Sequence, residues 1–425
     1  MKKIKITFPD NSFIEAENEI RPILFLEKFN AQNKKIVAVK VNNEICSLDS
    51  PVNITSSIEP VFSDSKDGSA IYRRSLCFVL AAAAHKIFPG KRLLVGHSLG
   101  YGYYYTLELG EPLTKENILK LKNEMEQIVK DDKIIETDFI SYSEACSLFE
   151  ELGLTETRKQ LNYRCPSRVQ INRLEGFSDL YFGPLVGTTG ILNVFDLLPY
   201  SDGFLLRFPK KGQPEKLTEF VDQPKLFEIY KSYKLWGKRL NVTSAASLNQ
   251  LIHDRKESEF IDITETLQTK RISTIADEIL KKKSARIVLI AGPSSSGKTT
   301  TSKKLALQLE AIGYKPKVIS LDSYYLGRAQ TPKDENGNYD YECLEALNIE
   351  LLNQNLVDLF AGKQIKLPSY DFHAGVSYFK GDTMTLEESD ILIMEGIHGL
   401  NDKLTPLVPA DKKFKIYISA LTQLN

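Results

Sequence analysis

The sequence predicts an α/β protein of several units in series, the last of which is a parallel sheet with helices on both faces. A chain of 425 residues is too long for one compact core. A polar stretch, Ser63–Ser69, follows a strand-rich start, and the charged run Lys281–Lys283 precedes an apolar run. After that run, apolar strand patterns alternate with helical ones, as in parallel sheets. We expect a β-grasp-sized unit at 1–63, an α+β unit at 64–240, a helical connector at 241–283 and the parallel sheet at 284–425.

The first unit reads as short strands joined by turns around an apolar stretch at Ile23–Phe29. The expected strands are Lys3–Phe8, Phe13–Glu17, Ile36–Val41 and Glu44–Leu48.

The second unit mixes helical and strand patterns. Residues 116–130 place Ile118, Leu121, Met125 and Ile128 at helical spacing with charges between them, which predicts an amphipathic helix. Gly96–Gly100 matches GxSxG, the nucleophile turn of hydrolases, but that turn requires a helix next. An aromatic run typical of a strand, Tyr101–Tyr105, follows instead, so we favour strand packing.

The last unit contains a phosphate-binding loop. GPSSSGKT at Gly292–Thr299 matches GxxxxGK(S/T), with a β-branched strand before it and a helical pattern after it that stops at Gly313. The glycines let backbone N–H groups converge on a polyphosphate, Lys298 would reach the β- and γ-phosphates, and Thr299 would hold Mg²⁺. We therefore expect ATP and Mg²⁺ as cofactors. The expected cofactor-binding residues are Gly292, Pro293, Ser294, Ser295, Ser296, Gly297, Lys298, Thr299 and Thr300.

Three further clusters are expected at the carboxyl ends of the strands, where ligands bind in such sheets. Asp322 follows a strand that should neighbour the phosphate-loop strand, and it could take the proton of an attacking hydroxyl. Pro368–His373 (PSYDFH) concentrates aromatic faces suited to a planar base. Glu395 ends an apolar strand, as an acid near Mg²⁺ does. The expected strands are Arg286–Ala291, Lys317–Leu321, Ile391–Met394 and Phe414–Ser419.

From about Arg286 to the last residue the chain resembles the uridine kinase and phosphoribulokinase family, in particular its uridine/cytidine kinase branch. The resemblance rests on GPSSSGKT, DSYY, NYDYECLEALN and YDF. It implies transfer of the γ-phosphoryl group of ATP to a nucleoside 5′-hydroxyl, with Lys298, Asp322 and Glu395 as catalytic residues and Thr299 and Glu395 at the metal. The implied substrate-binding residues are Asp322, Tyr325, Asp340, Tyr370, Phe372 and His373.

The chain departs from this family at two places. Pyrimidine kinases carry a histidine three residues after the phenylalanine of YDF, whereas Gly375 stands there and His373 directly follows Phe372. The family also continues into an arginine-rich lid, whereas the sequence ends at Asn425. We therefore expect ATP binding, with turnover that depends on such a lid. The acceptor is left open between a nucleoside, a sugar and another small alcohol.

The front half resembles two modules of threonyl-tRNA synthetases. Residues 1–63 resemble the TGS domain, and the segments His85–Tyr105 and Ser178–Leu192 resemble the editing domain. In the editing domain, an HxxxH and a CxxxH motif supply four residues that ring the hydrolytic site and could bind a metal. The corresponding four positions of this sequence hold Arg74, Phe78, Tyr181 and Leu185. None is a zinc ligand, so we expect no zinc and no deacylase chemistry, and we interpret this unit as a scaffold for binding or regulation.

Charge, cysteine content and motifs disfavour several kinds of partner, cellular location and function. Lys+Arg and Asp+Glu are both 55, so no overall charge favours nucleic acid or an anionic membrane. Five scattered cysteines outside any CxxC pair, and no apolar run long enough for a signal or a membrane span, predict a cytoplasmic protein. Because of the synthetase-like front half, an ATP-binding sensor or RNA-binding adaptor without turnover is left as an alternative function. A homo-oligomer is also left as an alternative. A GTPase is disfavoured because no NKxD segment is present.

Overall fold

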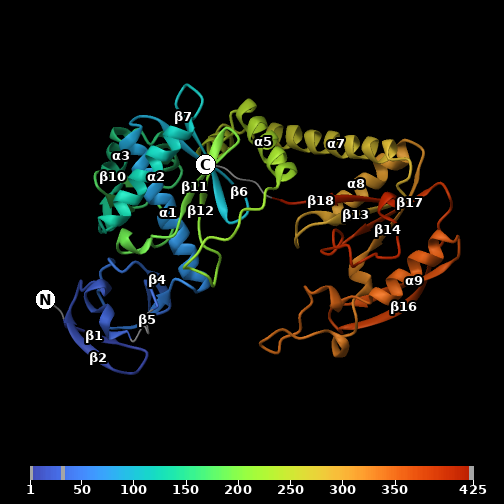
Figure 1. The fold of residues 1–425 in the computed structure, drawn as a ribbon, viewed down its shortest axis with the longest axis horizontal. Helices are drawn as coiled ribbons and strands as arrows, with labels where there is room; N and C mark the ends of the chain where they lie inside the picture. The colour runs from blue at the N-terminus through green and yellow to red at the C-terminus, as the bar shows by residue number, and fades with distance from the viewer. Residues whose placement is uncertain (1–2, 30–33, 421–425) are drawn as a thin grey trace. The chain divides into compact units, whose positions relative to one another are not determined.

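The structure is a computed structural model that describes residues 3–29 and 34–420 (Figure 1). Residues 1–2, 30–33 and 421–425, which belong to the expected first and last units, lie outside the described residues. The chain divides into two compact units, one up to Arg255 and one from Lys256 onward. The division falls within the expected connector 241–283, between α6 (Ala245–His253) and α7 (Glu257–Lys281).

The first unit begins with a mixed sheet in the order β2-β1-β5-β3-β4. Its strands are β1 (Lys3–Thr7), β2 (Phe13–Glu17), β3 (Ile36–Val41), β4 (Glu44–Cys46) and β5 (Ser56–Phe62). The four expected strands are present. We did not predict β5, whose polar start and Pro60 hide the alternation of buried Ser56, Ile58 and Val61. It is the central strand and the parallel partner of β1.

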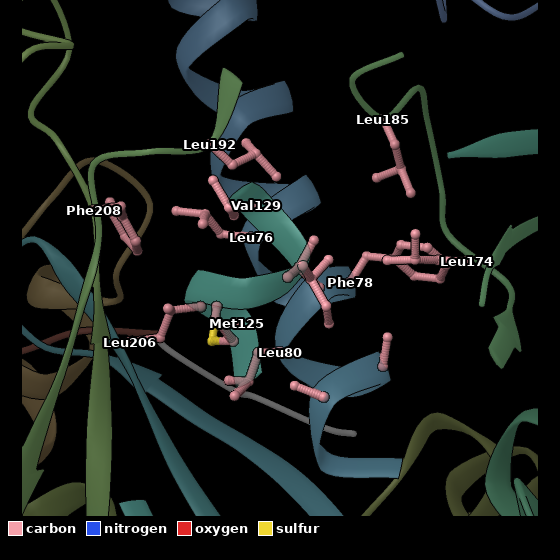
Figure 2. Packing of buried hydrophobic residues seen from close by; sticks show 14 of the residues in the cluster. Leu76, Phe78, Leu80, Met125, Val129, Leu174, Leu185, Leu192, Leu206 and Phe208 are labelled. Carbon is pink, nitrogen blue, oxygen red and sulfur yellow. The ribbon is translucent and has the colours of Figure 1, made fainter. Parts of the chain in front are cut away.

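A helix pair forms the main core of this unit. Helix α1 (Lys66–Ile87) begins at Ser65, whose side chain accepts the N–H of Gly68. Helix α2 (Lys115–Lys130) confirms the expected amphipathic helix and buries all four predicted apolar residues. Figure 2 shows Phe78 of α1 and Met125 of α2 inside this core.

A four-stranded antiparallel sheet, β11-β12-β7-β6, contributes to the same core. Its strands are β6 (Arg92–Ser98), β7 (Gly102–Glu108), β11 (Asp196–Tyr200) and β12 (Gly203–Arg207). Because Ser98 ends one strand and β7 follows, GxSxG lacks the helix that a nucleophile turn needs, and the expected aromatic strand is confirmed.

Further elements of the first unit include a smaller sheet and helices. A three-stranded sheet, β10-β9-β8, consists of β8 (Glu136–Ser141), β9 (Arg168–Leu174) and β10 (Phe177–Asp179). The helices are α3 (Tyr142–Glu151), α4 (Thr155–Gln160) and α5 (Pro224–Arg239). The smaller sheet packs with α3, and Phe227 of α5 packs against β7 and β12.

The second unit is a parallel sheet in the order β14-β17-β13-β18. Its strands are β13 (Ile287–Ala291), β14 (Lys315–Ser320), β17 (Asp390–Glu395) and β18 (Lys413–Tyr417). Ile287 and Leu289 share a core with α9 (Ile349–Phe360), whereas Val288 and Ile290 pack with α7 and α8 (Lys298–Ala311). Alternate residues of one strand thus meet helices on opposite faces, which confirms the predicted architecture.

Two placements in this unit were predicted wrongly. Strand β14, which leads to Asp322, pairs with β17 and is not the neighbour of β13. Residues Pro368–Asp371 lie in β15 (Ile365–Asp371), which pairs with β16 (Val376–Met384) in a separate antiparallel hairpin rather than ending a strand of the parallel sheet. The Asp371 carboxylate accepts the N–H groups of His373 and Ala374 at the turn, and Gly375 takes a positive φ of 70° there.

None of the helices in the described ranges combines the length and the hydropathy that a bilayer span requires.

Candidate active site

The loop between β13 and α8 has a backbone path that two glycines permit. Gly297, at the start of α8, adopts a left-handed φ of 85°. At Gly292 a Cβ atom would lie 2.2 Å from the carbonyl oxygen of Ile418, so no other residue fits without a shift of the backbone. The loop therefore opens onto the N-terminus of a 14-residue helix, which favours an anion.

Two polar side chains of this loop are suited to meet a ligand. The Lys298 ammonium donates to the carbonyl oxygen of Pro293 at 2.9 Å, across the loop. The Ser296 hydroxyl is buried and has no hydrogen-bond partner among the described residues. A phosphate group would satisfy both donors.

An acidic pair lies beside the loop. Glu395, at the end of β17, is only 4% exposed, and its Oε1 accepts the Thr299 hydroxyl at 3.1 Å. Asp322 follows β14 in a short 3₁₀ turn, Leu321–Tyr324. Burial raises the pKa of Asp322, the nearby charge of Glu395 raises it further, and Lys298 opposes both. The fold thus gathers Thr299, Lys298, Asp322 and Glu395 at one edge of the sheet.

This set of oxygens fits a magnesium ion. The Thr299 hydroxyl and the Glu395 carboxylate are hard oxygen ligands, which Mg²⁺ prefers when it is shared with nucleotide phosphates.

Four aromatic rings form a cluster near Asp322. The ring centroid of Tyr325 lies 5.6 Å from that of Tyr370, 6.0 Å from that of Phe372 and 6.1 Å from that of Tyr341. The Tyr325 hydroxyl donates to the backbone oxygen of Tyr341 at 3.0 Å, and burial first, then Asp322, raises its pKa to about 12. Tyr325 is therefore a neutral, fixed platform, and Phe372 is 60% exposed beside it. The cluster brings together the three aromatic residues that the resemblance implied.

The other two implied substrate residues lie differently. Oδ1 of Asp340 accepts the N–H groups of Glu342 and Cys343 at 2.9 and 3.1 Å, so a turn fixes this carboxylate. His373 is exposed on the hairpin turn and is held through its backbone N–H, at 2.8 Å from Asp371.

Sequence reasoning missed Arg328 and Tyr341. Tyr341 lies close enough to the Arg328 guanidinium to raise the pKa of Arg328, and burial first, then Tyr341, raises the pKa of Tyr370. The backbone N–H of Arg328 donates to Gly375 at 2.8 Å. A Cβ atom at Gly375 would lie 2.8 Å from Nε of Arg328, so the position where we noted a missing histidine is filled by this arginine. Tyr341 could have been found as the second tyrosine of the NYDYE motif, whereas no sequence motif marks Arg328.

The loop, the helix behind it and the acids at neighbouring strand ends define a P-loop nucleotide-binding domain. Residues 287–425 match the model of the phosphoribulokinase/uridine kinase family, so this part of the chain is a kinase domain of that family. A solved structure titled a possible uridine kinase from Bacillus stearothermophilus is 28% identical, with 35% of this chain and 79% of that chain covered and a TM-score of 0.29.

The front half is similar to parts of threonine–tRNA ligases. The Oleidesulfovibrio alaskensis ligase is 27% identical over 222 residues, which are 51% of this chain and 34% of that protein. The Lawsonia intracellularis ligase is 30% identical over 174 residues, 41% of this chain and 27% of that protein. The chain thus spans about a third of the length of these curated relatives.

The four positions of the expected hydrolytic ring lie in the first unit. Phe78 and Leu185 are fully buried in the main core, and the rings of Phe78 and Tyr181 meet edge to face at 5.3 Å. Arg74 donates to the carbonyl oxygen of Pro184 at 2.8 Å. Within the described ranges, no three of His, Cys, Asp and Glu are placed to hold a metal ion.

Proposed function

We propose that the second unit transfers the γ-phosphoryl group of ATP to a hydroxyl of a nucleoside-like acceptor, at its 5′ position. The observation that supports this most is the position of Asp322, a partly buried carboxylate close enough to Lys298 and Glu395 for both charges to shift its pKa. A nucleotide-binding loop alone would also serve a motor or a switch. A carboxylate facing the transferred group is what an alcohol acceptor needs.

The residues of the chain have separable tasks in this reaction. Backbone N–H groups of the loop and the N-terminus of α8 bind the phosphates, and Lys298 exchanges the Pro293 carbonyl for phosphate oxygens. Thr299 and Glu395 would hold Mg²⁺, which when bound neutralises phosphate charge. Asp322 orients the acceptor hydroxyl and accepts its proton. Because burial and then the charge of Glu395 raise its pKa, Asp322 is a stronger base than an ordinary aspartate.

The aromatic cluster supplies the acceptor pocket. A planar base would stack on Tyr370 and Phe372, with Tyr325 beneath, and Asp340 would bind sugar hydroxyls. Arg328 offers guanidinium donors at the same place, so it favours a base that presents acceptor atoms. Stacking supports a nucleoside over a simple sugar.

A panel of nucleosides and sugars with ATP and Mg²⁺ tests this proposal on the natural full-length chain. We expect ADP release that requires an acceptor and is strongest with one nucleoside. Tyr370→Ala should raise KM for that nucleoside while leaving the affinity for ATP unchanged, whereas Tyr378→Ala, on exposed β16, should change neither. Absence of acceptor-dependent ADP release across the panel would contradict the proposal.

The front half supports a second candidate, an ATP-binding sensor or RNA-binding adaptor without turnover, because about half of the chain is similar to threonine–tRNA ligases. Stoichiometric ATP binding combined with RNA binding and no ADP release would favour it over the kinase.

A further inference from the structure

A pocket lies entirely within the first unit, against helix α1 and strand β7. It has a volume of about 270 Å³ and is lined by Ala70, Arg73, Arg74, Cys77, Tyr103 and Tyr181. Two of these, Arg74 and Tyr181, occupy positions where the resemblance would have placed metal ligands. The pocket is of a size that holds a small molecule.

The two arginines of this pocket carry charges that the fold does not neutralise. Nε of Arg73 donates to the carbonyl oxygen of Ser69 at 3.2 Å, and Nη1 of Arg74 donates to that of Pro184 at 2.8 Å. Among the described residues, no Asp or Glu forms an ion pair with either one. Burial lowers the pKa of Arg74, which is the expected effect of a cation with too little compensation.

The surrounding side chains hold these guanidinium groups in place. The Arg73 guanidinium lies over the ring of Phe208, 5.4 Å from its centroid, and Tyr103 packs against the same ring at 4.8 Å. Gly183 has a positive φ of 103°, and a Cβ atom there would lie 2.9 Å from Nη1 of Arg74. The fold thus reserves space for Arg74.

The other lining residues carry no negative charge at neutral pH, and the Asp179 carboxylate, which acts on the pKa of Tyr181, is not among them. Burial raises the pKa of the Cys77 thiol to about 11, and it also raises those of Tyr103 and Tyr181, so all three side chains are neutral. Neutral hydroxyl groups can donate hydrogen bonds to an anion.

We propose that this pocket binds a small phosphate ester, with the phosphate held by the guanidinium groups of Arg73 and Arg74 and the hydroxyl groups of Tyr103 and Tyr181. Two uncompensated positive charges match a phosphate monoester, which carries about −1.5 to −2 charges near neutral pH. A carboxylate would neutralise only one of them. Guanidinium forks also suit the oxygens of a phosphate geometrically. This site is separate from the phosphate loop and does not depend on the proposed kinase activity.

Calorimetric titration with ribose 5-phosphate, inorganic phosphate and acetate tests the proposal. The titrations use the whole chain with Lys298→Ala, which removes the lysine of the phosphate loop. We expect saturable binding of ribose 5-phosphate, weaker binding of phosphate and none of acetate. Adding Arg73→Gln or Arg74→Gln should raise the dissociation constant about tenfold or more, because each removes charge-assisted hydrogen bonds. Arg239→Gln, an exposed arginine at the end of α5, is the control of equal charge change and should have no effect.

A second measurement needs no substitution at the pocket. Phenylglyoxal modifies accessible arginines, and mass spectrometry reports each site. Ribose 5-phosphate should slow modification of Arg73 and Arg74 several-fold and leave Arg239 unchanged. Equal rates with and without ribose 5-phosphate, loss of binding in Lys298→Ala relative to the wild type, or equal binding of acetate would each overturn the proposal.

Discussion

The sequence singled out one set of candidate site positions in each unit, and only in the second unit does the structure bring together side chains suited to the expected chemistry. In the second unit, the candidate phosphate site consists mainly of backbone N–H groups, whose path Gly292 and Gly297 permit. In the first unit, the resemblance to the editing domain points to a ring made of side chains alone, and Phe78 and Leu185 stand at two of the corresponding positions, buried in the core. A ring of side chains can be replaced by packing without changing the fold. A site made of backbone N–H groups is kept as long as the chain keeps the glycines that permit its path and the helix that follows them.

The same contrast appears in electrostatics. Around Asp322, positive and negative groups lie close together, so the charge of each is partly balanced. Around Arg74 no acid is within ion-pairing distance among the described residues, and the neighbours that act on it are Tyr103, Cys77 and Arg73. This difference agrees with our two proposals: phosphoryl transfer at the site around Asp322, and anion binding at the pocket around Arg74.

The largest expected effect is on turnover. Asp322→Asn should lower kcat by about 10² to 10⁴-fold, the usual contribution of a general base, with affinity for ATP unchanged within a few-fold. The control Asp411→Asn, an exposed carboxylate, should keep full activity. In the wild type, kcat should fall as the pH drops through a pKa above the usual 3.8 of an aspartate, because protonated Asp322 cannot accept the proton. Loss of ATP binding in Asp322→Asn would argue against the role as base.

Next in size is the effect of truncating Phe78, which stands at one of the positions counted against the editing-domain ring. Phe78→Ala should destabilise the first unit by about 3 to 5 kcal/mol in urea unfolding, because Phe78 is fully buried and a cavity remains. Phe139, which is 47% exposed, is the matched control, and Phe139→Ala should cost less than about 1 kcal/mol. A small loss of stability in Phe78→Ala would show that this position is not a packing position.

A buried carboxylate near Tyr181, Asp179, gives a pH-dependent effect. Burial raises the pKa of Asp179 to about 6 from 3.8, so the folded state binds its proton more tightly than the unfolded state. Its stabilising contribution is complete below the unfolded pKa and is lost as pH rises through about 6.

Asp179→Asn removes this loss of stability at higher pH, because an amide side chain does not ionise. It should raise the free energy of unfolding by about 1 to 3 kcal/mol at high pH and change it little in acid. Denaturant titrations across this pH range check the sign. Asp138→Asn, a more exposed carboxylate of the same unit, should show no such trend. A variant that is more stable only in acid would contradict the assignment.

The smallest effect concerns the phosphate loop itself. Gly292→Ala should weaken binding of an ATP analogue about tenfold, because the added Cβ displaces the loop from the backbone at Ile418. At Gly327 the nearest atom to an added Cβ is 3.9 Å away, so Gly327→Ala should leave that affinity unchanged. Equal affinities in the two variants would show that the loop path is not restricted at Gly292.

Local pattern was enough to predict the parallel sheet, the helix after the phosphate loop and the helix at 116–130. These elements carry strong periodicity and glycine signals, and their packing agrees with their local preference. The order of strands was not predictable in this way: placing β17 between β14 and β13 depends on long-range pairing that no local pattern encodes. The place of Arg328 likewise arises from a contact between residues tens of positions apart, its backbone N–H donating to Gly375. The hairpin of Tyr370 is a local pairing that we did not recognise, because its strands lie outside the parallel sheet.

We propose above all that the backbone of Gly292–Thr299 binds ATP in a domain in which Asp322 acts on the acceptor hydroxyl. Calorimetric titration of the wild type, Lys298→Ala and Asp322→Asn with a non-hydrolysable ATP analogue and Mg²⁺ tests it most directly. We predict one site per chain in the wild type, binding at least about tenfold weaker in Lys298→Ala, and near-normal binding in Asp322→Asn. No binding in the wild type, or equal binding in the wild type and Lys298→Ala, would contradict it.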